Sequence, residues 1–543
     1  MKTVKISVLV ILFSVVGNVF GQTVSSIDEL DQQYMDWYNL DQKTHGFVGV
    51  ATEKAYDELI GEKKTKKTVV VAVMDSGVDI DHDDLKGRIW INEKEIDGNG
   101  IDDDANGFID DIHGWNYLGN SKGENLHYEN MEFTRLYRTL KPIYENVESE
   151  EGLSNQEKAD YHLYLRVKEH YNQEAQKRTE EMEGITRFEM IFQAAKGIIK
   201  NEAGTDDYSI ESLKSITASS ERIDAAKAFL IERFEEGFTE EVLRDYKRHT
   251  EDYVEKYLNI DFNPRKIIGD DPMDITDTAY GNPDVIGPGS NHGTAVSGVI
   301  AAVRNNGLGI NGIAEDVKIM VLRTTPDGDE RDKDVALAIR YAVDNGADII
   351  NMSFGKDFSP QKHFVDEAVK YAEAHNVLII HAAGNDAQNV EEVPSYPSDA
   401  YLDGIPATNW LNVGASAPKL DKELVASFSN YAQHQVDIFA PGQHIISLDT
   451  ANTYSMNDGT SLAAPVVAGV AALVLSYYPD LTCTELIDVL MESSSKIKKP
   501  KVYQPNPDGE KGKPVKFATL SKSGGIVNAY EAMLLAEKKY GNR

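Results

Sequence analysis

The sequence predicts an α/β fold, a doubly wound and mainly parallel sheet with helices on both faces, plus an all-α insertion. Three observations predict it. Residues 68–74 form a continuous β-branched and apolar run, as expected for a strand covered on both faces. Similar runs, separated by helical periods, recur at 317–322, 348–353, 377–382 and 411–413. Between about 120 and 262 the strand pattern stops and charged residues alternate with apolar ones at helical spacing.

The N-terminus has the pattern of an export signal. Lys2 and Lys5 precede an apolar run over residues 6–20, which is shorter than the roughly 18 to 20 residues that cross a bilayer. We predict a signal peptide over 1–21, followed by an N-terminal extension over 22–67. An uncleaved anchor is the alternative. The expected location is therefore periplasmic or extracellular, with no membrane span after signal removal.

Three polar side chains follow buried strands. Asp75 comes directly after the first run, and Ser353 and Asn385 come at the ends of later ones. In a doubly wound sheet, ligands gather at the carboxyl ends of the strands. Taken alone, a carboxylate such as Asp75 or an amide such as Asn385 at a strand end is more often structural than functional.

Two further segments carry groups that could take part in catalysis. His292 opens a helix of small residues, and Ser461 lies in the first turn of an Ala-rich helix that contains Pro465. A serine in that place offers a hydroxyl and an N–H that has no acceptor within the helix. Ser461 could equally be an N-cap residue, and a single histidine is usually structural.

Together these segments resemble the subtilisin-like serine proteases. The matching sequences, in chain order, are Asp75-Ser-Gly-Val-Asp, Asn291-His292-Gly-Thr-Ala, His381-Ala-Ala-Gly-Asn385 and Gly459-Thr-Ser461-Leu-Ala. The resemblance covers about 65–120 and 262–540. It implies a subtilisin-like peptidase domain over 68–119 and 263–540, interrupted by a helical insertion over 120–262.

The resemblance implies a serine endopeptidase that cleaves protein substrates through an acyl-enzyme. Ser461 would be the nucleophile, His292 the general base and Asp75 the group that orients the imidazole, with Asn385 in the oxyanion hole. The segment Ile350-Asn-Met-Ser-Phe-Gly355 looks like the family's substrate strand. The implied substrate-binding residues are Ser353, Phe354, Gly355 and Gly384.

The helical insertion separates Asp75 from His292 by far more residues than is common in the family. Because the chain returns from it shortly before His292, we expect the insertion to lie beside the substrate cleft. It could restrict access to the cleft, bind a partner or only decorate the fold.

An acidic loop predicts a structural calcium site. Its oxygen ligands would come from alternate positions, with a glycine at the sixth, as in a hand-type calcium loop. The candidate metal ligands are Asp102, Asp104, Asn106, the Phe108 carbonyl and Asp110. The twelfth position is His113 instead of a bidentate glutamate, so another carboxylate would have to complete the shell. A solvated Asp/Asn/Gly turn is the alternative.

Composition limits the partners. With 89 acidic and 55 basic side chains the formal charge is -34, which would repel nucleic acid and anionic membranes. Cys483 is the single cysteine, so no intramolecular disulfide can form. We expect a monomer that binds protein or peptide substrates.

Two rival functions stay open at this point. A peptide-binding protein could keep the cleft without turnover. An esterase of the α/β-hydrolase type would need a Gly-x-Ser-x-Gly elbow and a serine that comes first in the chain, whereas Ser461 follows Asp75 and His292.

Overall fold

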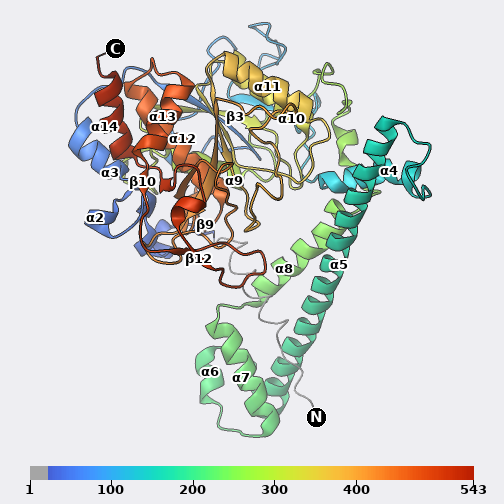
Figure 1. Cartoon of the computed structure of the whole chain (residues 1–543). Helices are drawn as coiled ribbons and strands as arrows, with labels where there is room; N and C mark the ends of the chain where they lie inside the picture. Colours follow the sequence, from blue (N-terminus) through green and yellow to red (C-terminus); the bar gives the residue numbers. More distant parts are fainter. Residues whose placement is uncertain (1–22, 543) are drawn as a thin grey trace. The chain divides into compact units, whose positions relative to one another are not determined.

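A computed structural model describes residues 23–542, and Figure 1 shows the course of the chain. The predicted signal peptide, residues 1–21, lies outside the described residues. The chain divides into two compact units. One is Phe133–Asn263, and the other consists of the described parts of Phe20–Glu132 and Pro264–Arg543.

The larger unit is built on a nine-stranded sheet with the order β10-β13-β7-β6-β5-β4-β1-β3-β2. Its strands are β1 (Val69–Asp75), β2 (Gly114–Asn116), β3 (Val317–Arg323), β4 (Ile349–Met352), β5 (Leu378–Ala382), β6 (Trp410–Ser416), β7 (Ile438–Pro441), β10 (Ser495–Lys496) and β13 (Gly525–Ile526). All pairings are parallel except that of β10 with β13. The predicted fold class is therefore confirmed.

Helices cover both faces of this sheet. One face carries α9 (Asn291–Ala301), α12 (Thr460–Tyr477), α13 (Cys483–Ser493) and α14 (Ala529–Tyr540), and the other carries α10 (Asp332–Asp344) and α11 (Lys362–Ala374). Strand β1 shows why both faces need cover. Val71 and Val73 belong to the first hydrophobic core, whereas Ala72 and Met74 belong to the second.

Helix α12 runs through the centre of the first core. Among the described residues it is the one helix long and apolar enough to cross a membrane, and 94% of it is buried inside the protein. Figure 1 shows α13 and α14 beside it.

The N-terminal extension is part of the same core. It contains the short helices α2 (Gln42–His45) and α3 (Thr52–Ala55). Trp37 and Tyr38 are fully buried in it, and Val24 pairs with Tyr454 of β9. Two small antiparallel sheets complete the unit, formed by β8 (Ile445–Asp449) with β9 (Thr453–Asn457) and by β11 (Val502–Tyr503) with β12 (Pro514–Val515).

The smaller unit is the helical insertion. Its helices are α4 (Glu132–Tyr144), α5 (Asn155–Ile198), α6 (Ile210–Ser215), α7 (Glu221–Glu235) and α8 (Glu240–Asp252). Helix α5 has 44 residues and begins at a capping box, in which Ser154 and Glu157 satisfy each other's backbone N–H groups.

The insertion has a hydrophobic core of its own. Phe188 and Phe192 of α5 are buried in one cluster with side chains of α6, α7 and α8. Helices α7 and α8 contact α5, and α6 lies beside α7 (Figure 1). The first helix begins at Glu132, later than residue 120, because the preceding stretch belongs to the main unit: Leu118 and Leu126 are buried in its second core. The predicted domain boundaries stay a prediction.

Candidate active site

Asp75 is the last residue of β1, at the carboxyl edge of the sheet. Its side chain is 2% exposed. One carboxylate oxygen, Oδ1, accepts a hydrogen bond from the Ser76 N–H at 2.7 Å and lies 2.8 Å from Nδ1 of His292. The buried carboxylate is thus held in one orientation and faces the imidazole.

His292 lies in the first turn of α9, and its side chain is 39% exposed. A Cβ atom on the next residue, Gly293, would lie 2.1 Å from the Gly77 carbonyl oxygen, so only glycine lets α9 approach the end of β1 this closely. The bond from Nδ1 to Asp75 leaves Nε2 of the imidazole without a hydrogen-bond partner among the described residues. The imidazole is therefore held at one nitrogen and open at the other.

The environment of His292 changes its proton affinity. Burial by itself would lower the pKa of the imidazole, but the charge of Asp75 and the hydrogen bond to it raise that pKa above its ordinary value of 6.5. The carboxylate therefore favours the imidazolium that forms whenever Nε2 takes up a proton.

Ser461 lies in the first turn of α12, where backbone N–H groups lack an acceptor within the helix. Its carbonyl oxygen accepts a hydrogen bond from the Ser353 hydroxyl at 2.8 Å. A Cβ atom on Gly459 would lie 2.7 Å from the Ser461 Oγ, so glycine leaves room for the hydroxyl.

The structure brings Asp75 and His292 into contact, but no hydrogen bond joins Ser461 to His292 within residues 23–542. Their helices, α9 and α12, pack against each other. Hydrogen bonds of catalytic groups are often long when no substrate is bound, so this geometry is compatible with a serine activated by the imidazole.

Asn385 follows β5, and Thr460 holds its side chain. The Oδ1 atom of Asn385 accepts hydrogen bonds from the Thr460 N–H at 2.8 Å and from the Thr460 hydroxyl at 2.9 Å. The amide orientation is thereby fixed with Nδ2 as the remaining donor. No sequence pattern assigns a role to Thr460, although it lies directly before Ser461.

The candidate substrate residues lie where β4 and β5 end. The Ser353 hydroxyl accepts a hydrogen bond from Asn351, and the Gly384 N–H donates to the Thr460 hydroxyl at 3.1 Å. Gly384 has a φ of +101°, and a Cβ atom there would lie 2.4 Å from the Asn430 amide nitrogen, so this position requires glycine.

His381 is a second histidine at this edge of the sheet, and no sequence pattern assigns a role to it. Its Nε2 lies 2.9 Å from the Phe354 carbonyl oxygen and its Nδ1 3.0 Å from the Asn412 Oδ1. Burial lowers its pKa to about 4, outweighing these two hydrogen bonds. His381 also lines a cavity of about 330 Å³ under the loop that contains Tyr396. It is therefore a neutral side chain that holds Phe354.

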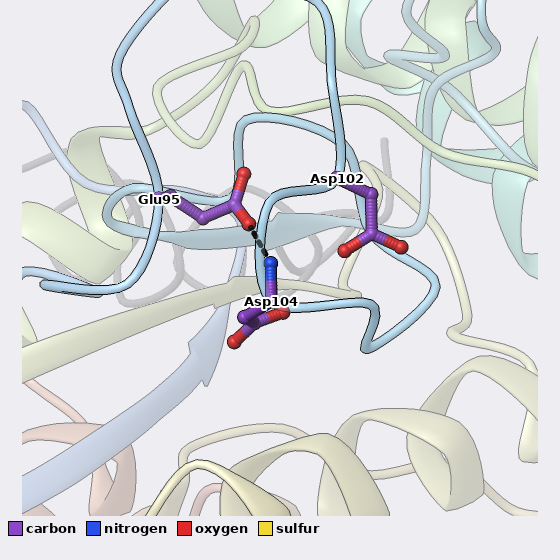
Figure 2. Close-up of side chains that lie close together, drawn as sticks. All are labelled: Glu95, Asp102 and Asp104. Atoms are coloured by element: carbon purple, nitrogen blue, oxygen red, sulfur yellow. Dashed lines mark hydrogen bonds between the residues drawn. The ribbon is translucent and has the colours of Figure 1, made fainter.

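The acidic loop gathers three carboxylates, which Figure 2 shows facing one another. Ligand atoms of Glu95, Asp102 and Asp104 all lie within 4.8 Å of one another. Glu95 is buried, and its Oε1 accepts hydrogen bonds from the N–H groups of Asp103 and Asp104 at 2.8 and 3.1 Å. No sequence pattern marks Glu95 as a ligand, because it precedes the alternating ligand positions and resembles an ordinary surface glutamate.

Of the other predicted ligands, Asp110 is not one of the three grouped carboxylates, whereas Asn106 lies beside two of them and donates its N–H to Oδ1 of Asp102 and of Asp104, each at 3.1 Å. Asn106 accepts a hydrogen bond from the Phe108 N–H and donates its amide to Asp111. The Asp110 carboxylate accepts hydrogen bonds from the N–H groups of Asn99 and Gly100 at 3.0 and 2.9 Å. The Asp110 side chain thus braces the loop, whereas Asp102 and Asp104 approach Glu95.

Comparison with known proteins gives a family match. The model of the subtilase family, Peptidase_S8, matches residues 66–514. This range includes the carboxyl edge of the sheet where the candidate residues lie, the acidic loop, the insertion and every candidate site residue described above.

Several curated proteins are similar to part of the chain. A thermophilic serine proteinase of Bacillus sp. (strain AK1) is 36% identical over 40% of this chain and 49% of its own length. The halolysin-like extracellular serine protease Nep of Natrialba magadii is 36% identical over 39% of this chain and 37% of its own. Subtilisin DY of Bacillus licheniformis is 32% identical over 38% of this chain and 72% of its own. The chain thus spans half or less of the length of the first two relatives.

Proposed function

Because the chain belongs to the subtilase family, we propose that it is a serine endopeptidase that hydrolyses peptide bonds of protein substrates through an acyl-enzyme. The observation that carries the proposal is the 2.8 Å hydrogen bond from His292 Nδ1 to Asp75. It fixes the imidazole so that Nε2 can serve as the base for a nearby hydroxyl.

In the proposed first step the Ser461 Oγ attacks the carbonyl carbon of the scissile bond while its proton passes to His292 Nε2. The negative charge that develops on the carbonyl oxygen is stabilised by the Asn385 Nδ2 and the Ser461 N–H. When the C–N bond breaks, His292 returns the proton to the departing amine. Asp75 stabilises the imidazolium in between.

In the second step water replaces the amine. His292 Nε2 takes a proton from the water, whose oxygen attacks the acyl carbon, and the proton then passes to Ser461 as the ester bond breaks. Throughout, the substrate chain would lie along Ser353, Phe354 and Gly355, with Gly384 on the opposite side.

A small fluorophosphonate probe tests this function. Attack by an activated serine displaces fluoride and leaves a phosphonyl group on its oxygen. We expect labelling of Ser461, identified by mass spectrometry of the digested protein, and no labelling of Ser461→Ala. Ser149→Ala, which removes an exposed serine of the insertion, is the matched control and should label normally. A wild-type protein that binds peptides but neither labels nor cleaves them would favour the non-catalytic alternative.

A structural cation is the second part of the proposal. Glu95, Asp102 and Asp104 offer the carboxylate oxygens that calcium prefers, at mutual distances that one ion can bridge. Like charges this close repel, and a bound cation would relieve that repulsion. The ion would stabilise the loop and would take no part in peptide hydrolysis.

Export is the third part. The apolar run over residues 6–20 and the likeness to a relative named as extracellular support it. Export to the periplasm or the medium would place a mature N-terminus near Gln22. N-terminal sequencing of protein recovered from each cell fraction tests this, and retention of Met1 on a cytoplasmic product would contradict it.

A further inference from the structure

Four consecutive residues at the start of α10 each form an ion pair. Arg331 pairs with Glu129, Asp332 with Lys356, Lys333 with Asp270, and Asp334 with Arg265, at distances of 2.8, 2.9, 2.9 and 2.6 Å. The side chains of Asp332, Lys333 and Asp334 are at most 3% exposed. Such a dense row of buried charges is unusual, because each costs desolvation and must be paired.

The partners come from three chain segments that are far apart in the sequence. Glu129 belongs to the stretch that leads into the helical insertion. Arg265 and Asp270 belong to the stretch that follows the insertion, and the Tyr280 hydroxyl adds a hydrogen bond of 2.6 Å to Asp334. Lys356 directly follows Gly355 of the proposed substrate segment. The first turn of α10 therefore joins two stretches of the larger unit, one on each side of the insertion in the sequence, to that segment.

Lys356 is the centre of this arrangement on the substrate side. Its side chain is 1% exposed, and its Nζ lies 3.0 Å from Glu132 Oε2, 2.9 Å from Asp332 Oδ1 and 2.9 Å from the Glu330 carbonyl oxygen. Glu132 is the first residue of α4 and donates its own N–H to the Asp329 carboxylate at 2.7 Å.

The backbone of Lys356 is fixed as well. Its N–H donates to the Tyr396 carbonyl at 2.8 Å, and its carbonyl accepts from the Tyr396 N–H at 2.9 Å. On the other side of Gly355, the Phe354 carbonyl is held by His381. The substrate segment is therefore held from both ends, by an imidazole at Phe354 and by an ammonium group at Lys356.

We propose that Lys356 is a positioning residue for the substrate-binding segment 353–355, and that it fixes this segment, through Glu132 and Asp332, to the stretch of the larger unit that precedes the helical insertion. This inference rests on the proposed peptidase function. Buried ion pairs contribute little net stability but allow few alternative geometries, which suits a segment whose backbone must meet a substrate in register.

Two reactions with different demands test the proposal. Cleavage of an extended peptide needs the substrate segment, whereas a small fluorophosphonate needs only the serine, its base and the oxyanion donors. For Lys356→Met we expect kcat/KM for an extended peptide to fall about tenfold to a hundredfold, while the rate of fluorophosphonate labelling changes less than about twofold. Lys356→Arg, which keeps the charge, should recover part of the loss.

Lys333→Met is the matched control. Lys333 lies in the first turn of α10 and is as buried as Lys356, but it pairs with Asp270 and Asp277 and does not contact Lys356. This variant should lower the melting temperature, but kcat/KM for the extended peptide and the rate of fluorophosphonate labelling should change by similar factors. If Lys356→Met does not fold, the triple variant with Glu132→Gln and Asp332→Asn also removes the charges of the two carboxylates that pair with the Lys356 ammonium. It should show the same difference between peptide cleavage and labelling.

Equal losses in both reactions, or an unchanged kcat/KM in a folded Lys356→Met protein, would overturn the inference. Failure of the proposed function has a different signature. In that case the wild-type protein itself would not be labelled at Ser461.

Discussion

The carboxyl edge of the sheet and the acidic loop both place carboxylates close to other polar groups, but the groups that face those carboxylates differ. At the sheet edge the Asp75 carboxylate faces an imidazole, and the Asn385 amide is held by both donors of Thr460. In the loop, Glu95, Asp102 and Asp104 face one another. The first arrangement pairs its carboxylate with an imidazole, although Asp75 Oδ2 is buried without a hydrogen-bond partner among the described residues. The second gathers three carboxylates, of which Asp104 has Lys94 at 3.8 Å, and a cation would balance the remaining charge.

Asp75→Asn would break the sheet-edge arrangement most severely. The asparagine amide can donate a hydrogen bond to Nδ1 of the imidazole. His292 would then carry its own proton on Nε2, which could no longer accept the proton of Ser461. The charge that raises the pKa of His292 would also be lost. We expect kcat for a peptide substrate to fall about 10⁴-fold with little change in fold.

Steady-state kinetics with circular dichroism as a check of folding would measure this effect. Asp348→Asn is a suitable control, because Asp348 is an aspartate at the opposite end of the sheet, where it accepts a hydrogen bond from the Val70 N–H. A loss of less than tenfold in folded Asp75→Asn would show that His292 does not depend on this carboxylate.

The proposed oxyanion donor gives the next largest effect. Asn385→Ala removes Nδ2 and leaves both donors of Thr460 unpaired at that position. We expect kcat to fall about 10²- to 10³-fold with KM nearly unchanged, because the lost hydrogen bond forms mainly in the transition state. Asn389→Ala removes a nearby amide whose partner is the exposed Glu392, and should leave both constants unchanged. A rise in KM alone in Asn385→Ala would instead assign the amide to substrate binding.

The difference between the two regions also explains how far the sequence could predict them. Strand β1 was predictable because a continuous apolar run over 68–74 leaves few alternatives to a strand covered on both faces. Its end then had to lie at the ligand-binding edge of the sheet. The candidate residues Asp75, His292 and Ser461 were recognisable because each lies in a short sequence motif.

Polar contacts between residues far apart in the chain leave no comparable pattern in the sequence. Glu95 is recognisable only after the loop folds back, when its carboxylate receives the N–H groups of Asp103 and Asp104. Lys356 joins Glu132 and Asp332 across long stretches of chain, and ion pairs have no periodicity that a sequence pattern could reveal. Apolar periodicity reports burial, but the choice of a charged partner depends on tertiary structure.

The acidic loop should respond to chelation without any change in chemistry. If calcium balances the three carboxylates, an ion present at a hundred times its Kd stabilises the native protein by about 2.7 kcal/mol. We therefore expect EDTA to lower the melting temperature of the Ser461→Ala protein, which cannot digest itself, by a few degrees, and added calcium to restore it.

Variants of the loop distinguish the removal of a bound ion from any other effect of EDTA on the protein. Glu95→Gln should lower the melting temperature in calcium and make the protein insensitive to EDTA, whereas Glu93→Gln, an exposed neighbour, should behave as wild type. The active Glu95→Gln enzyme, assayed well below its melting temperature, should keep its kcat, because the carboxylate has no contact with Asp75 or His292. An EDTA response that persists in Glu95→Gln would place the ion elsewhere.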